Sequence, residues 1–116
     1  MIIESELIRC YNLADSVERD IIDRMWLKHI KDEPCFYSGS METAQPHHIR
    51  VAGACGIGLK PPDIYCIPIN YIVHNNLHTK GISYVEDKFN VDTENKLKEM
   101  HNYFYYEYYA KIREVL

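Results

Sequence analysis

Several features that define large classes of proteins are missing from this sequence. No apolar run approaches the ~18 residues that a membrane-spanning helix needs, and the acidic, early-charged N-terminus does not fit a secretory signal peptide. No internal repeat or low-complexity linker interrupts the chain. Hydrophobic residues make up 47% of its 116 residues and charged residues 26%, which excludes a disordered or collagen-like protein. We therefore expect one domain spanning residues 1–116, located in the cytoplasm.

Paired cysteine motifs are also absent. The four cysteines at positions 10, 35, 55 and 66 include no Cys-x-x-Cys pair. Without a secretory signal, reduced thiols in a reducing compartment are expected rather than two disulfides.

An excess of positive charge is missing as well. Arg and Lys total 13 against 17 Asp and Glu, a net charge of −4, which argues against a protein that coats nucleic acid non-specifically. The acidity is uneven, because residues 1–33 carry −3 and residues 82–116 carry −2, whereas residues 34–81 carry +1. The central segment can therefore still meet DNA, although we expect weak binding that depends on a metal ion or a partner protein.

Helical periodicity is present at both ends of the chain. Apolar residues recur every three or four positions from Ile8 to His29, and no Gly or Pro intervenes before Pro34, so one long helix or two shorter ones fit equally. Asp92 is a good N-cap for a C-terminal helix. Within that helix, aromatic residues cover every side of the segment 103–109, which favours core packing over a partner surface or a base-stacking platform.

The central segment has a different composition. All five prolines and all five glycines lie between residues 34 and 81, as in a compact unit of turns and short elements. Short strands are predicted at residues 48–51 and 64–67, joined by a loop, and a helix over 70–80 that Gly81 ends. The expected class is therefore α+β: a hairpin and a helix between two helical flanks, residues 1–33 and 82–116.

Histidines are concentrated in this central segment, at positions 47, 48, 74 and 78. His74 and His78 share one face of the predicted helix and can chelate one ion, although two histidines at this spacing also fit a solvated face. The pair His47-His48 strengthens the metal hypothesis, since three histidines can bind the ion while one stays unligated as a base. Neighbouring strand residues point to opposite faces, so both can serve one site only at a strand end or bend, which Pro46 favours.

Several short motifs carry a family resemblance. They are Pro34-Cys-Phe-Tyr-Ser-Gly, Pro46-His-His-Ile-Arg, Lys60-Pro-Pro-Asp, Ile67-Pro-Ile-Asn and His74-Asn-Asn-Leu-His-Thr-Lys-Gly. In this order they resemble HNH endonucleases, and more narrowly phage and prophage proteins such as the recombination-enhancement (Ref) nucleases. Nuclease-type colicins share the two histidine motifs. The resemblance runs from about Leu27 to the start of the last helix and implies a ββα-metal core, a hairpin and a helix around one divalent cation.

The resemblance also implies an activity and roles for individual residues. The protein would be a metal-dependent hydrolase that cuts DNA in recombination or DNA processing, with DNA and a recombinase or another DNA-processing protein as partners. His48 would be the general base, and Asp63 would hold a histidine or the loop. The ligands of one Mg²⁺, Mn²⁺, Zn²⁺ or Ni²⁺ ion would be His47, His74 and His78. The candidate phosphate contacts are Arg50, Lys60 and Lys80.

The sequence departs from this family at two places. Many relatives carry Cys-x-x-Cys at the positions of residues 35–38 and 70–73, where their four cysteines bind a structural zinc. Only Cys35 remains here, which excludes a four-cysteine zinc site and leaves the stabilisation to apolar burial by the flanking helices. The position near Tyr65, often Asn in HNH proteins, is also changed. Two alternatives stay open: an inactive HNH fold that binds DNA or protein, and a metal-free module that binds a partner through its tyrosine-rich helix.

Overall fold

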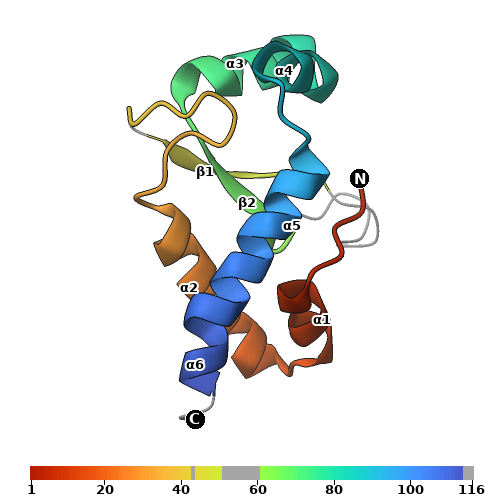
Figure 1. Ribbon diagram of the computed structural model, residues 1–116, viewed down its shortest axis with the longest axis vertical. Helices are drawn as coiled ribbons and strands as arrows, with labels where there is room; N and C mark the ends of the chain where they lie inside the picture. The colour runs from red at the N-terminus through yellow and green to blue at the C-terminus, as the bar shows by residue number, and fades with distance from the viewer. Residues whose placement is uncertain (43, 51–60, 114–116) are drawn as a thin grey trace.

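The structure is a computed structural model and describes residues 1–42, 44–50 and 61–113 (Figure 1). It has α-helices, a 3₁₀ helix (η1), a π-helical segment (η2) and two strands. Their order is α1 (Glu6–Leu13), α2 (Ser16–Ile30), β1 (Gln45–His48), η1 (Asp63–Tyr65), β2 (Cys66–Ile69), α3 (Tyr71–Lys80), α4 (Ile82–Phe89), α5 (Thr93–Phe104), η2 (Tyr105–Tyr109) and α6 (Ala110–Arg113). The predicted α+β class is confirmed. In the described part of the chain, no helix combines the length and apolar character needed to cross a bilayer.

Two helices, rather than one, occupy the N-terminal flank. Ala14 is extended and ends α1, and the Asp15 carboxylate accepts a hydrogen bond from the Glu18 N–H at 2.8 Å to cap α2. A side chain that competes for a helix-initiating N–H favours a new start over continuation. The periodicity fitted either one long helix or two shorter ones, and the structure has the two shorter helices.

The sheet consists of β1 and β2, paired antiparallel, with Pro46 opposite Pro68 and His48 opposite Cys66. The N–H of Ile49 continues the ladder to the Tyr65 carbonyl at 3.2 Å, and the Pro68 carbonyl accepts outward from Phe36 N–H at 2.7 Å. Pro46 and Pro68 therefore face each other at a position where the backbone N–H groups point away from the partner strand. A proline, which has no N–H, costs the ladder nothing there.

The predicted strand limits were wrong for that reason. Strands were expected at residues 48–51 and 64–67, but β1 starts three residues earlier and β2 two residues later than predicted. Pro46 and Pro68 lie at a position of the ladder where neither N–H would face the partner strand, so they remove no ladder hydrogen bond and both strands include them. Most of the predicted loop at residues 52–63 lies outside the described residues.

Helix α3 confirms the predicted helix over residues 70–80. The Asn70 side chain caps it by accepting from Val73 N–H at 2.9 Å, and Gly81, at φ +88°, ends it. Helix α4 follows at once and was not predicted as a separate element. Its Val85 is fully buried, and Asn90 in the left-handed conformation ends it. A β-carbon at Gly81 would be strained, so this glycine permits the sharp turn between the helices.

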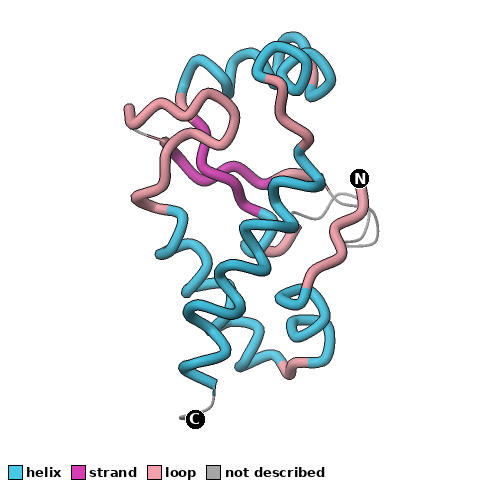
Figure 2. Tube along the Cα trace, in the orientation of Figure 1, coloured by secondary structure: helices cyan, strands magenta, loops and turns pink. Residues whose placement is uncertain are grey.

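The core lies where α5 crosses the hairpin, with α2 on one side and α1 on the other (Figures 1 and 2). Trp26 of α2 is fully buried against Phe104 and donates its Nε1–H to the Cys66 carbonyl at 3.0 Å. In the aromatic segment, Phe104 and Tyr109 are buried, but the tyrosines at 103, 106 and 108 are exposed. Core packing therefore explains only part of that segment.

His101 of α5 is the main polar group in this core. Its Nε2–H donates to the Ile64 carbonyl at 2.7 Å, so Nδ1 accepts from the Ser5 hydroxyl at 3.2 Å. Ser5 Oγ in turn accepts from the Ile8 N–H at the start of α1. Burial lowers the pKa of His101 to about 4. The neutral ring thus ties α1, α5 and η1 together with all its hydrogen-bonding groups satisfied.

Candidate functional site

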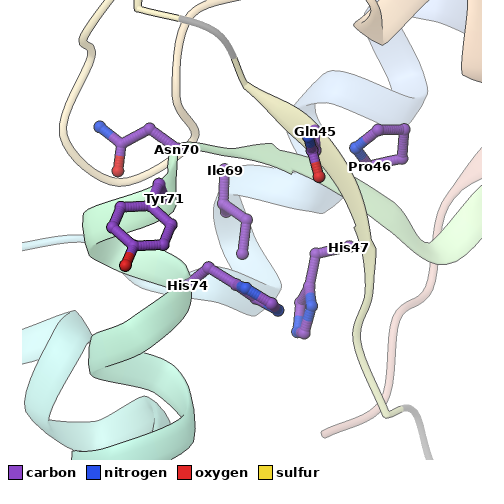
Figure 3. Close-up of a pocket in the computed structure, with 7 residues that line it drawn as sticks. All are labelled: Gln45, Pro46, His47, Ile69, Asn70, Tyr71 and His74. Carbon is purple, nitrogen blue, oxygen red and sulfur yellow. The ribbon is translucent and has the colours of Figure 1, made fainter.

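Three of the four clustered histidines meet between the hairpin and α3. His47 projects from β1, and His74 and His78 project from successive turns of α3 (Figure 3 shows His47 and His74 pointing toward each other). The Nε2 atoms of His74 and His78 are 2.9 Å apart. The His47 ring centroid lies 5.3 Å from that of His74 and 6.2 Å from that of His78. The structure therefore brings together the three residues that the sequence nominated as ligands.

The protonation state of this cluster suits a cation. Burial, followed by the nearby imidazoles of His74, His78 and His48, lowers the pKa of His47 to about 4. His47 is therefore neutral at neutral pH, and a neutral imidazole is the form that ligates metals.

The donor set also discriminates between ions. Two nitrogens that each lie ~2.1 Å from one ion are about 3.0–3.4 Å apart at ligand angles of roughly 90–109°, close to the 2.9 Å between His74 and His78. Three imidazoles suit Zn²⁺ or Ni²⁺ and leave coordination positions open, whereas Mg²⁺ prefers oxygen ligands. Of the four ions considered from the sequence, Zn²⁺ and Ni²⁺ fit these residues best.

His48 faces different neighbours from His47. Its Nε2 lies 2.7 Å from Oδ1 of Asp63, so the carboxylate holds this ring in the way anticipated for Asp63. His48, Asp63 and Cys66 also each offer a ligand atom, all within 4.8 Å of one another, and form a candidate metal-binding group among the described residues. Cys66 was not among the candidate ligands taken from the sequence. Cys66 comes beside His48 through the pairing of β1 with β2, and the predicted strand limits specified no such pairing.

Two cavities meet at His47. A cavity of about 240 Å³ lies on the side of His74 and Tyr71 (Figure 3). A larger one, about 540 Å³, is lined by His47, His48 and His78 together with Arg50. Because β1 ends at His48, both adjacent histidines reach the larger cavity. The condition that the site lie at a strand end is thus met.

The candidate phosphate contacts are placed unequally. Arg50 is exposed and lines the larger cavity beside His48. Lys80 stands at the end of α3 with its Nζ 4.8 Å from the centre of the Tyr84 ring, and it is not among the residues that line the cavity. Lys60 lies outside the described residues.

Hydrogen bonds join the segments where the resembling nucleases have zinc-binding cysteines. Burial raises the pKa of Cys35, but hydrogen bonds from the Ser38 side chain and from the N–H groups of Ser38, Asn70 and Tyr37 outweigh it and lower the pKa. The Asn70 side chain also donates to Ser38 Oγ at 3.3 Å. These bonds fix the segment before β1 against the start of α3, beside the histidine cluster.

Comparison with known proteins places the chain in a family. Residues 14–103 match the family described as "Protein of unknown function (DUF968)". This chain belongs to the DUF968 family. The matched segment contains the hairpin, α3 and all four clustered histidines.

One curated relative of this DUF968 member is "Uncharacterized protein YdfU" of Escherichia coli (strain K12), which is 35% identical over 71 residues. That alignment covers 57% of this chain and 20% of the relative, so the similarity spans about a fifth of the longer protein. No solved structure matches the chain.

Proposed function

We propose that this DUF968 member is a metal-dependent endonuclease that hydrolyses DNA phosphodiester bonds. Its HNH (ββα-metal) core would be β1, β2 and α3. One observation carries the proposal: three imidazoles from a hairpin and a helix converge, and a fourth imidazole, held by a carboxylate, lines the same cavity. A divalent ion bound by His47, His74 and His78 would neutralise negative charge on the scissile phosphate and the leaving oxygen.

His48 is the general base in this proposal. Because the Asp63 carboxylate accepts from Nε2–H, the lone pair of the neutral ring is on Nδ1. Nδ1 takes a proton from water, the water oxygen forms a bond to phosphorus, and the leaving oxygen departs and is protonated from solvent. Asp63 is a positioning residue, since it orients the ring and stabilises the imidazolium that forms.

Arg50 is the phosphate-positioning residue. Arg50 lines the cavity that His48 also lines, and a permanent cation there would attract the DNA backbone without reading its sequence. Lys80, in the last turn of α3, would add a further contact to the phosphates. The flanks carry 15 of the 17 acidic residues, so a recombinase or another DNA-processing partner would help to deliver the substrate. A phage origin, a role in recombination and a cytoplasmic location are parts of the proposal that rest on the sequence alone.

A plasmid-nicking assay tests the proposal. Purified protein should nick supercoiled plasmid with Ni²⁺ or Zn²⁺, and EDTA should stop the reaction. His48→Ala should abolish nicking while Ni²⁺ still binds, and His29→Ala, a histidine outside the cluster, should cut normally. A His48→Ala protein that cuts as fast as the parent would remove His48 as the base. Absence of nicking with Mg²⁺, Mn²⁺, Ni²⁺ and Zn²⁺ would overturn the proposed nuclease activity. DNA binding without cutting would favour the alternative of an inactive HNH fold that binds DNA.

A further inference from the structure

We infer that the other face of the hairpin holds a second cation site, formed by His48, Asp63 and Cys66, for a soft divalent ion such as Zn²⁺ or Cd²⁺. An ion there would occupy His48 and so switch off the base. The binding site stands on its own geometry, and only its inhibitory effect rests on the proposed nuclease.

The strand register builds this site. His48 and Cys66 are opposite each other in β1 and β2, in a pair that makes no ladder hydrogen bonds. Side chains of such pairs approach each other most closely. Between the strands, η1 turns the chain so that Asp63, three residues before Cys66, sets its Oδ1 2.7 Å from His48 Nε2. The ligand atoms of His48, Asp63 and Cys66 therefore lie within 4.8 Å of one another.

The backbone beneath these ligands is firmly held. The Cys66 carbonyl accepts from Trp26 Nε1–H at 3.0 Å, and the Cys66 N–H donates to the Asp63 carbonyl. The N–H of Ile64, between them, donates to Asp23 Oδ1 at 3.0 Å. All four residues of β2 are buried. Ligands on a preorganised backbone lose little entropy when an ion binds, which favours affinity.

The donor atoms determine which ion fits. A sulfur, a nitrogen and one carboxylate oxygen suit a thiophilic tetrahedral ion and leave a fourth position for water. On binding, the Cys66 thiol releases its proton to solvent, and the thiolate and the Asp63 carboxylate together balance the +2 charge of the ion. A neutral site is compatible with burial, and it has no net charge with which to attract a phosphate. An ion at the three-histidine cluster, in contrast, keeps its full +2 charge for the substrate.

This contrast predicts inhibition by excess zinc. His48 cannot accept a proton from water while its nitrogen ligates an ion. Nicking should therefore rise with the first equivalent of Zn²⁺ and fall with further Zn²⁺ or Cd²⁺. Mn²⁺, which prefers oxygen ligands, should not inhibit.

Cobalt absorption tests the site directly, without DNA. Co²⁺ bound to a thiolate gives an intense near-ultraviolet charge-transfer band that imidazole and carboxylate ligands do not give. Titration of the whole chain with Co²⁺ should produce this band, Cys66→Ser should lose it, and the matched control Cys35→Ser should keep it. Cys66→Ser should also need at least about tenfold more Zn²⁺ for the same fractional inhibition.

Specific outcomes would overturn the second site. They are no thiolate band in the parent protein, or an undiminished band in a Cys66→Ser protein that circular dichroism shows to be folded. If Cys66→Ser does not fold, Asp63→Asn decides, because it keeps the sulfur and should weaken Co²⁺ binding at this band at least about tenfold. Unchanged affinity in Asp63→Asn contradicts the site. A thiolate band in a protein that never nicks DNA would overturn the nuclease but support the second site. Nicking by a protein that gives no thiolate band would support the nuclease and overturn the second site.

Discussion

The two faces of one short hairpin differ in chemistry although their key residues are neighbours in the chain. The His47 face meets α3, where His74 and His78 add two more imidazoles, and it opens into two cavities. The His48 face meets η1 and the core, where a carboxylate and a sulfur lie close by. Although successive strand residues usually point to opposite sides, both histidines line the larger cavity because β1 ends at His48. Their nearest partners still differ, since His47 joins the imidazoles of α3 and His48 lies beside the Asp63 carboxylate.

Removal of a ligand from the His47 face should have the largest effect. We expect His74→Ala to weaken Ni²⁺ binding by at least about 100-fold, measured by isothermal titration calorimetry, because one of three imidazoles is lost. His29→Ala provides the control, since His29 packs among aromatic rings away from the cluster. Equal Ni²⁺ affinity in His74→Ala and His29→Ala would show that the three histidines do not act together.

Acid should lower the free energy of unfolding through His101, which supports the backbone beneath His48 and Asp63. His101 holds the Ile64 carbonyl, next to Asp63, and its pKa is about 4 when folded against 6.5 in the unfolded chain. His101 therefore makes no pH-dependent contribution to the free energy of unfolding well above pH 6.5. As the pH falls from 6.5 to 4, only the unfolded chain takes up this proton, so unfolding becomes easier by up to ~3 kcal/mol. Urea denaturation across this range measures the slope. His101→Gln should make it shallower, and His47, whose pKa is also lowered to about 4, accounts for a remaining part. An equally steep slope in His101→Gln would assign the acid sensitivity to other groups.

Asp63→Asn should separate the two faces by activity. The amide cannot stabilise an imidazolium, so we expect nicking to slow about 10- to 100-fold. Ni²⁺ affinity at the three-histidine cluster should change less than about twofold, because Asp63 faces His48 and not His47. Nicking rates and calorimetry on the same preparation check this split. A parallel loss of both would mean that the faces are coupled.

Asn70→Ala should have the smallest effect and should act on the His47 face. It removes the N-cap of α3 and should cost about 1 kcal/mol of stability. Fraying of the first turns of α3 should also weaken Ni²⁺ binding a few-fold while leaving the Co²⁺ thiolate band unchanged. Asn95→Ala, which removes a side chain exposed in the first turn of α5, serves as the control. A changed thiolate band in Asn70→Ala would show that α3 also supports the other face.

Much of the fold could be predicted from local signals. Asn70 and Gly81 delimit α3, and Asp92 starts α5, because capping side chains and a glycine at positive φ act over one turn of chain. The strand limits could not be predicted in this way. Whether Pro46 and Pro68 break a strand depends on which residue each one faces, and pairing is a property of two distant segments.

The sequence by itself determined the helical flanks, the α+β class and the spacing of His74 and His78 on one helix face, because these follow from the period and capping of a single segment. It also nominated His47, His48 and Asp63. Only the tertiary structure decided that His47 joins the α3 histidines and that His48 contacts Asp63. It also placed Cys66 beside His48 and Asp63. The reason is physical: strand register and the packing of α5 and α2 against the hairpin set which side chains meet, and neither is encoded in any one stretch of residues.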